Sequence, residues 1–229
     1  GGVMDFLEVD GIPYQHYSRT EQQANRDYKP MVATDFKYVA PEGNVDWDYI
    51  KEQEGFVTTG NIPKNNDGTV MGHSGMTVAS GYDLGSKDSD SLYGLHTMTK
   101  ENLMPWLGLQ GEEAATKERE GLAPATLTTS QAKEVNRHSK KATMKSLRKA
   151  WKEATGNNFD DLPKNKATPI ADVVFHHGLS KTKTYNFWSQ VTSDDWVGAE
   201  ANLRNFGEKN DSLQARRTRG ADYFRDNTE

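Results

Sequence analysis

Residues 44–85 read NVDWDYIKEQEGFVTTGNIPKNNDGTVMGHSGMTVASGYDLG, which predicts a short helix, a polar loop and an apolar return strand. We expect the helix over about residues 45–54. Trp47, Ile50 and Glu54 recur there at spacings of three and four, so they share one helix face. Glu54 would then stand half-buried at the end of an apolar stripe. Burial disfavours the charged form of a carboxyl group and raises its pKa, as a general acid that works near neutral pH requires.

The second half of this stretch has the pattern of a β-hairpin. Phe56 to Ile62 predicts a strand, residues 63–68 (PKNNDG) are dense in turn formers, and Gly75 to Leu84 predicts the return strand. Side chains alternate across a strand, so Thr77 and Asp83 are expected on one face, which is small and polar. The floor of a cleft for a bulky polar substrate would have this composition.

The composition of the chain limits its function. It has 229 residues, a formal charge of −5 and no cysteine. This length suits one large domain or two lobes that share a core. The lack of Cys excludes a disulfide, a thiolate metal site and a Cys nucleophile. The negative charge argues against generic binding to nucleic acid or to a membrane surface. No apolar run approaches the roughly 18 residues of a transmembrane helix, and no signal-peptide pattern is present.

Residues 54–85 resemble the catalytic hairpin of the lysozyme superfamily that includes phage lysozymes and pesticin-like muramidases. In the phage pattern a Glu ends the first helix, an Asp follows on the hairpin, and a Thr lies on the next strand. Met71 occupies the place of that Asp here, and the order Glu54, Thr77, Asp83 is similar to the pesticin-like branch, in which the Asp follows the Thr. The resemblance implies an α+β, mostly α, two-lobed fold with a small β-hairpin lobe and a helical C-terminal lobe.

The resemblance also implies catalytic roles. Glu54 would be the acid, Asp83 would activate water or stabilise charge, and Thr77 would bind the water or the sugar through its hydroxyl group. In an inverting glycosidase the two carboxyl groups lie roughly 6.5–9.5 Å apart. Six residues of straight strand span about 20 Å. Thr77 and Asp83 can therefore act together only if the strand bends near Ser80-Gly81 or if they flank the Glu54 carboxyl from different sides.

Two alternatives remain open for the second carboxylate. Asp67, in the hairpin loop, competes with Asp83 for this role. Asp83 itself could instead serve as a turn cap before Leu84. The order of the family motif favours Asp83 as the functional carboxylate.

A long helix is expected over about residues 130–154. Thr128 and Gln131 have the spacing of a capping box, and Gly156 is placed to end the helix. This helix carries eight basic residues between Gln131 and Lys152: Lys133, Arg137, Lys140, Lys141, Lys145, Arg148, Lys149 and Lys152. They form either a solvated face or a basic strip that attracts an anionic polymer such as cell wall or nucleic acid. By resemblance, this is the helix that joins the two lobes.

Other signals predict where helices begin. Asn44 is a plausible N-cap of the first helix, since its side chain can accept from an orphan N–H. Thr168 followed by Pro169 predicts a helix start, because Pro is favoured at the first helical position. The last helix is expected over about Ser212 to Arg225.

The run TPIADVVFHHG at residues 168–178 resembles the buried central helix of the phage lysozyme C-terminal lobe. The resemblance places Phe175 near the cleft floor, where the family contacts sugar, and gives His176 a hydrogen bond on the cleft side. His176 and His177 are adjacent and point about 100° apart on a helix, so we expect no shared metal ion. We include Tyr82 of the return strand among the candidate substrate-binding residues.

By the same resemblance, an Arg of the last helix reaches the catalytic Glu, and Arg216 matches that position. We also count Arg216 among the substrate-binding candidates. An Arg beside Glu54 would hold the carboxyl in place and lower its pKa, which opposes the effect of burial. The sequence leaves open which effect dominates.

The chain divides into an N-terminal segment and one domain. Residues 1–43 have scattered aromatics and no helical period, which predicts an extended arm or a linker. Residues 44–229 are expected to form a muramidase-like domain, with a hairpin lobe at about 55–85 and a helical lobe at about 160–226. We expect a monomer with no cofactor and no metal ion.

The resulting hypothesis is a peptidoglycan hydrolase that cleaves the β-1,4 bond between N-acetylmuramic acid and N-acetylglucosamine. Similar domains serve as bacteriocins or as effectors delivered to a rival's periplasm, often with a cognate immunity protein, and we expect delivery of this kind. The alternatives are a phage endolysin or tail lysozyme, a lytic transglycosylase, an inactive peptidoglycan-binding module and a nucleic-acid binder. Neither nucleic acid nor a membrane is expected as a partner.

Overall fold

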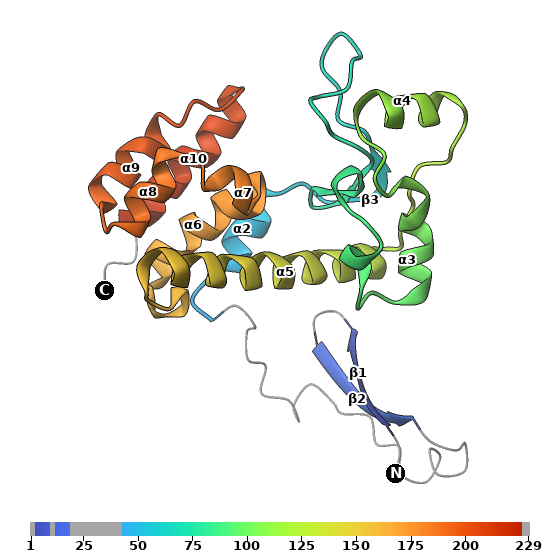
Figure 1. Ribbon diagram of the computed structural model, residues 1–229, viewed down its shortest axis with the longest axis horizontal. Coiled ribbons are helices and arrows are strands. Elements are labelled where there is room, and N and C mark those ends of the chain that lie inside the picture. The colour runs from blue at the N-terminus through green and yellow to red at the C-terminus, as the bar shows by residue number, and fades with distance from the viewer. Residues whose placement is uncertain (1–2, 10–11, 19–42, 226–229) are drawn as a thin grey trace. The chain divides into compact units, whose positions relative to one another are not determined.

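The computed structural model describes residues 3–9, 12–18 and 43–225. It is 61% helical and has a small three-stranded antiparallel sheet, so the fold is α+β and mostly α, as predicted (Figure 1). The chain divides into two compact units. We call residues 56–138 the sheet unit, and residues 43–55 with 139–225 the helical unit.

The N-terminal segment contains a β-hairpin. Strands β1 (Val3–Val9) and β2 (Ile12–Ser18) pair antiparallel and form a two-stranded sheet of their own. The rest of the predicted arm or linker, residues 19–42, lies outside the described residues.

The sheet unit is organised around strands β3 (Val57–Asn61), β4 (Thr77–Ala79) and β5 (Tyr82–Asp83), in that order. The single return strand predicted over Gly75 to Leu84 is therefore wrong. The chain reverses between β4 and β5, where Ala79 and Gly81 have φ angles of 51° and 87°. A positive φ is rare for residues other than Gly. The reversal pairs Thr77 directly with Asp83.

Short helices complete the sheet unit. They are η2 (Leu84–Ser86), η3 (Asp90–Leu92), α3 (Thr97–Leu103), η4 (Met104–Trp106) and α4 (Gly111–Arg119). The core of this unit includes Met76, Val78, Leu84, Leu103 and Trp106. The compact unit thus continues well beyond the predicted hairpin lobe, because these helices cover the apolar side chains that the short strands leave.

Helix α5 (Thr129–Thr155) agrees with the predicted long helix. Its capping box is present: Gln131 N donates to Thr128 Oγ1 at 3.1 Å, and Thr128 N donates to Gln131 Oε1 at 2.9 Å. At the other end, Gly156 has a φ of 75° and its N–H donates to the carbonyl of Lys152.

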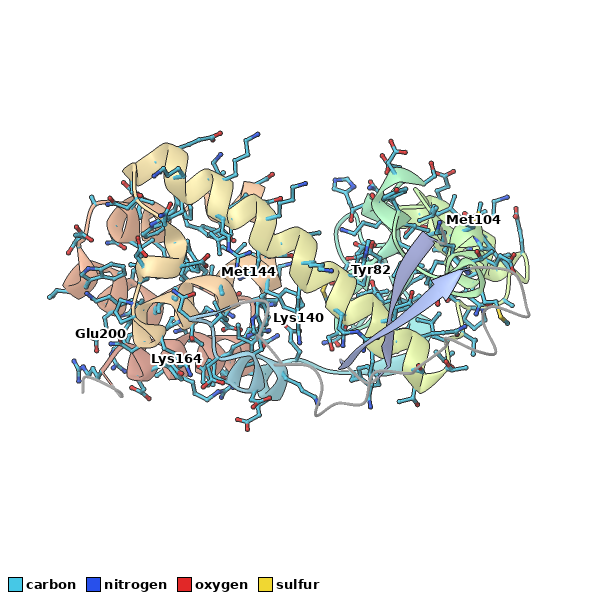
Figure 2. All side chains as sticks on the ribbon, turned by 90° about the horizontal axis from the view of Figure 1, so that it is seen from below. Tyr82, Met104, Lys140, Met144, Lys164 and Glu200 are labelled. Atoms are coloured by element: carbon cyan, nitrogen blue, oxygen red, sulfur yellow. The ribbon has the colours of Figure 1, made fainter. Side chains whose placement is uncertain are left out.

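The helical unit contains α2 (Trp47–Gln53), η5 (Phe159–Asp161), α6 (Lys164–His177), α7 (Leu179–Thr182), α8 (Asn186–Thr192), α9 (Trp196–Arg204) and α10 (Asp211–Arg225). Its core includes Ile50, Met144, Leu147, Ile170, Phe187 and Leu203. Met144 lies on the buried side of α5 (Figure 2).

Two predicted helix starts are wrong. Asp46, not Asn44, caps α2, because its Oδ1 accepts from Tyr49 N, while the Asn44 amide donates to the carbonyls of Phe159 and Leu162. Pro169 lies inside α6. An interior Pro costs roughly 3 kcal/mol in an isolated helix, but residues 167–174 of α6 are all buried, so packing outweighs the local preference.

None of the helices in the described ranges combines the length and the hydropathy that a membrane span needs.

The sheet unit has little space around Gly75. A Cβ atom there would lie 2.3 Å from the Leu109 carbonyl oxygen and 2.8 Å from the Gly85 Cα. Because both neighbours are backbone atoms, we expect Gly75→Ala to lower the free energy of unfolding by about 1–3 kcal/mol. Gly55→Ala is the control, since a Cβ atom at Gly55 meets nothing within 4 Å. Urea denaturation measures both variants, and equal stabilities would contradict the close packing at Gly75.

Candidate active site

The end of α2 places Glu54 in a nearly buried position. Glu54 is the C-cap of the helix, and its side chain is 12% exposed. Arg216, from α10, donates through Nη2 to Glu54 Oε1 at 2.5 Å. The predicted contact between an Arg of the last helix and Glu54 is therefore present, although the two residues lie 162 positions apart in the chain.

Asp172 fixes the guanidinium group of Arg216 from its other side. Arg216 donates to Asp172 through Nη2 at 2.6 Å and through Nε at 3.2 Å. Arg217 also donates to Asp172, from Nη2 at 3.2 Å. The Asp172 side chain is 2% exposed and that of Arg217 is fully buried. A buried charge is tolerated only when it is paired, so these residues hold one another in place.

The network continues from Arg217 to Glu208, which follows α9, and to the two histidines at the end of α6. Its Nε lies 3.7 Å from Glu208 Oε1, and that oxygen is 2.6 Å from His177 Nε2. Its Nη2 lies 3.2 Å from His176 Nδ1. Since a guanidinium only donates, Nδ1 must accept, and a neutral His176 carries its proton on Nε2. The resemblance implied a hydrogen bond of His176 on the cleft side. The hydrogen bond in the structure is instead made with the buried Arg217.

The electrostatics of this network favour a protonated Glu54. Burial raises the pKa of Glu54, which the neighbouring Arg216 opposes without reversing. The sequence left open whether burial or Arg216 has the larger effect on this pKa, and the effect of burial is the larger one. Two guanidinium groups here face three carboxyl groups, those of Glu54, Asp172 and Glu208. The charges balance when Glu54 holds its proton and the histidines are neutral.

The histidines meet that condition. Burial, followed by the charges of Arg216 and nearby cations, lowers the pKa of His176 to about 2. Burial also lowers the pKa of His177, although the hydrogen bond to Glu208 opposes this. Both rings are therefore neutral near pH 7 in this environment.

His176, His177 and Glu208 offer ligand atoms within 4.8 Å of one another, which is compact enough for a metal ion. The buried guanidinium of Arg217 contacts both His176 and Glu208. A divalent cation at this place would face a fixed positive charge, and His176 would have to surrender the nitrogen that accepts from Arg217. These residues fit the hydrogen-bonded network better than a metal centre.

Phe175, which precedes His176 in α6, packs against the first turn of α2. Its ring meets that of Trp47 edge to face, with centroids 5.8 Å apart, and both residues are half-buried. Lys140 places its Nζ 5.2 Å from the centre of the Trp47 ring. The partly accessible rings of Trp47 and Phe175 offer an apolar surface on which a sugar ring could pack.

The sheet unit positions Thr77 and Asp83 as neighbours. Directly opposed residues of antiparallel strands have Cα atoms about 4.5–5.5 Å apart and share one face. The predicted bend near Gly81 is thus present, and it brings Thr77 and Asp83 together. Thr77 Oγ1 donates to the Gly75 carbonyl at 3.1 Å, so its lone pairs can still accept a hydrogen bond.

One oxygen of Asp83 is fully engaged by the backbone. Its Oδ1 accepts from Gly75 N at 3.0 Å and from Gly85 N at 2.9 Å, which makes Asp83 the cap of η2. The turn-cap alternative therefore describes its geometry. It does not exclude a chemical role, because the hydrogen bonds in the described residues leave Oδ2 available.

The other candidates of the sheet unit have different surroundings. Tyr82 is 7% exposed and packs in the core, with Lys87 Nζ 4.9 Å from the ring centre, so it offers little surface to a ligand. Asp67 is exposed, and its Oδ1 accepts from Thr69 N and Thr69 Oγ1 in the hairpin loop. These hydrogen bonds lower the pKa of Asp67 and account for its position in the loop.

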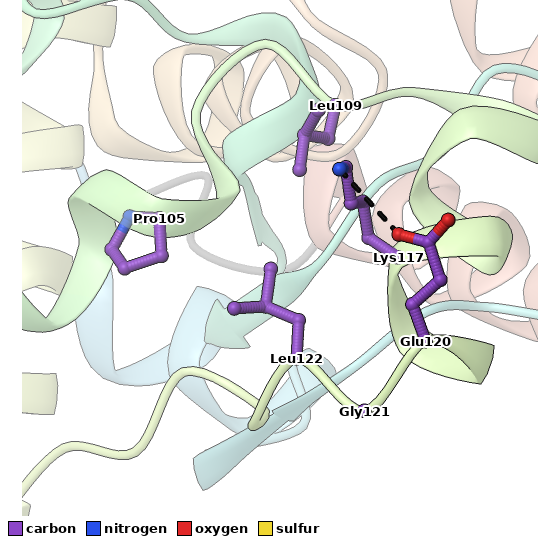
Figure 3. A pocket seen from close by; sticks show the side chains of 6 residues that line it. All are labelled: Pro105, Leu109, Lys117, Glu120, Gly121 and Leu122. Carbon is purple, nitrogen blue, oxygen red and sulfur yellow. Dashed lines mark ion pairs between the residues drawn. The ribbon is translucent and has the colours of Figure 1, made fainter.

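A separate pocket of about 480 Å³ lies in the sheet unit. It is lined by Pro105, Leu109, Lys117, Glu120, Gly121 and Leu122 (Figure 3). Two of the lining residues, Lys117 and Glu120, form an ion pair of 3.5 Å at the end of α4. The lining includes none of the predicted site residues.

Sequence reasoning missed Asp172, Arg217 and Glu208. Asp172 carried a signal, since it is a single acid in the apolar run PIADVVF, where an unpaired charge would not be tolerated. Arg217 and Glu208 carried none, because they lie among many charged residues that are exposed.

The fold and the site together define a class. A mostly helical α+β chain, with a buried Glu–Arg pair after its first helix and a Thr–Asp pair on its hairpin, is lysozyme-like. A family model described as Pesticin, a bacterial toxin homologue of phage lysozyme (C-terminal part), matches residues 44–197. The match covers more than half of the chain, and the chain belongs to this family. No curated protein matches the sequence.

Loss of Asp172 should be costly because it leaves two buried guanidinium groups without their main partner. We expect Asp172→Ala to lower the free energy of unfolding by about 3–5 kcal/mol. The matched control is Asp160→Ala, which breaks the Arg148–Asp160 pair, whose Asp160 side chain is 52% exposed. An exposed pair contributes only about 0–1 kcal/mol. Chemical denaturation of both variants measures the difference, and similar losses would refute the role of burial.

The raised pKa of Glu54 should reduce stability as pH rises. Between the ordinary value of 4.5 and the higher folded value, the folded protein binds a proton that the unfolded chain has lost. Above the folded value, the ionised side chain destabilises the folded state. We therefore expect Glu54→Gln to melt above wild type at pH 8, and this difference to shrink towards pH 4. A difference that grows as pH falls would contradict the raised pKa.

Proposed function

We propose that this chain is a muramidase that hydrolyses the β-1,4 bond between N-acetylmuramic acid and N-acetylglucosamine in peptidoglycan. The observation that carries the proposal is Glu54: a nearly buried carboxyl group with a raised pKa, held at one oxygen by Arg216. General acids are kept protonated near neutral pH by such surroundings. The membership of the toxin family supports an antibacterial role.

Glu54 acts as the general acid in this proposal. Arg216 donates to Oε1, so Oε2 carries the proton towards the glycosidic oxygen. As the bond between the anomeric carbon and that oxygen breaks, the oxygen takes the proton and leaves as a sugar hydroxyl. Developing positive charge on the sugar is stabilised by nearby carboxylates. Arg216 keeps the resulting Glu54 carboxylate in place until it is protonated again.

Asp83 and Thr77 supply the second half of the reaction. Thr77 Oγ1 donates to a carbonyl, so it accepts a hydrogen bond from water and orients it. Asp83 Oδ2 accepts the other hydrogen of the water, while Oδ1 stays fixed by two backbone N–H groups. The water oxygen adds to the anomeric carbon, and its proton passes to Asp83. Phe175 and His176 are proposed to contact the sugar.

The proposed setting is the cell wall of a rival bacterium. A toxin of this kind reaches peptidoglycan in the periplasm, so delivery there and a cognate immunity protein in the producing cell are part of the proposal. A monomer is sufficient for it.

The test is the clearing of purified peptidoglycan by wild type and single variants. We expect Glu54→Gln to lower the rate by about 100-fold or more, which is typical for loss of a general acid, and Asp83→Asn to lower it as well. Glu52→Gln is the matched control, because Glu52 is an exposed carboxyl on the same helix. Full activity of Glu54→Gln would refute the assignment.

Mass spectrometry of the released fragments separates the related reactions. Reducing ends identify hydrolysis, whereas anhydro ends identify a lytic transglycosylase. An inactive wild type that still binds peptidoglycan would be a binding module instead.

A further inference from the structure

Four lysines form a row along the middle and end of α5: Lys141, Lys145, Lys149 and Lys152. Their spacings of four, four and three place them within about 80° of the helix circumference, since successive residues turn by about 100°. They extend over about 16 Å along the axis at 1.5 Å per residue. All four are exposed and belong to the helical unit. We call this set the lysine row.

The lysine row faces away from the core of its unit. The buried residues of the same part of α5 are Met144, Leu147, Ala150 and Trp151. Their mean direction lies roughly 150° from that of the row by the same helical geometry. The side chains of the row therefore contribute nothing to the packing of the core.

No ion pair in the described part of the chain includes a member of the row. The adjacent Arg148 forms an ion pair with Asp160, so this carboxylate does not neutralise a lysine of the row. Glu153 follows Lys149 by four residues, but a Lys that precedes Glu is the weaker order for a helix pair. The row is thus an uncompensated strip of positive charge.

The row is unfavourable for the helix that carries it. Like charges four residues apart destabilise a helix, and this applies to the pairs 141/145 and 145/149. The helix dipole favours Lys152 in the last turn, but its effect does not reach Lys141 or Lys145. Without the row, the described residues of the helical unit have about as many acidic as basic side chains, so the row is not part of a generally basic surface. A partner of opposite charge would account for it.

The geometry of the row selects the kind of partner. Its members lie in a line on the convex surface of one helix, so they cannot converge on a single small anion. A polymer that carries anions at intervals along its length fits such a line. Peptidoglycan has this chemistry, since its glycan strands carry peptides with free carboxylates.

We propose that the lysine row binds the peptide carboxylates of peptidoglycan and holds the protein on its polymeric substrate. This proposal rests on the proposed function. Attachment at a second place raises the effective concentration of the substrate at the active site, without a new contact to the bond that is cleaved. Nucleic acid is a weaker fit, because the net negative charge of the chain repels a long dense polyanion.

The experiment measures binding without hydrolysis. Glu54→Gln is mixed with purified sacculi, and the bound fraction is determined by sedimentation across a range of salt concentrations. The test protein adds Lys141→Gln, Lys145→Gln, Lys149→Gln and Lys152→Gln. We expect its affinity at low salt to fall about ten-fold or more, and the dependence of affinity on salt to become shallower.

The matched control removes the same charge elsewhere. Lys164→Gln, Lys181→Gln, Lys183→Gln and Lys209→Gln change four other exposed lysines of the helical unit in the same Glu54→Gln background. We expect this protein to bind nearly as the parent does. Sacculi whose carboxylates have been converted to neutral amides with a carbodiimide and methylamine should bind the parent and the row variant equally. Circular dichroism confirms that each protein is folded.

Each outcome decides the proposal. Equal losses in the row and control variants would overturn it, as would unchanged binding of the row variant or a loss that persists on sacculi with amidated carboxylates. A row variant that binds sacculi normally but no longer binds duplex DNA would also overturn it, in favour of nucleic acid. Row-dependent binding by a wild type that releases no fragments would refute the muramidase and leave the binding surface standing.

Discussion

The helical unit depends on the hydrogen bonds that the guanidinium group of Arg216 donates. It joins the end of α2 to the middle of α6, because it donates to Glu54 and to Asp172 at once. Arg217, the next residue, also donates to Asp172 and forms an ion pair with Glu208. A buried network of this kind adds little net stability compared with apolar packing, but it permits only one arrangement of the elements that form it. It therefore determines where the carboxyl group of Glu54 lies.

The same network relates stability to chemistry. A Glu side chain that faces two guanidinium groups in water would be ionised well below neutral pH. Here burial has the largest effect, and the neighbouring carboxylate of Asp172 acts in the same direction, so the pKa of Glu54 is raised despite the guanidinium groups. Arg216 can then orient the carboxyl group without removing its proton. The protonation of Glu54, the proposed acid, is therefore controlled by residues that need not contact the substrate.

The sequence predicted the features that depend on neighbours along the chain. Glu54, the polar loop and the capping box of α5 follow from local patterns, and the family motif added Thr77, Asp83 and Arg216. Gly81 indicated a possible bend, but the full chain reversal was not predicted, since the positive φ at Ala79 has no local signal. Pro169 was misplaced because burial in the finished fold outweighs its helix-breaking tendency. Asp172, Arg217 and Glu208 are brought together only by tertiary packing.

The contribution of α10 has a consequence for biosynthesis. Glu54 is synthesised 162 residues before Arg216, the side chain that holds it, which belongs to the last helix that the structure describes. A nascent chain on the ribosome therefore has the carboxyl group before it has the clamp, and the proton donor is unformed until α10 has emerged. Proteolytic loss of α10 would remove Arg216 and with it the clamp on Glu54.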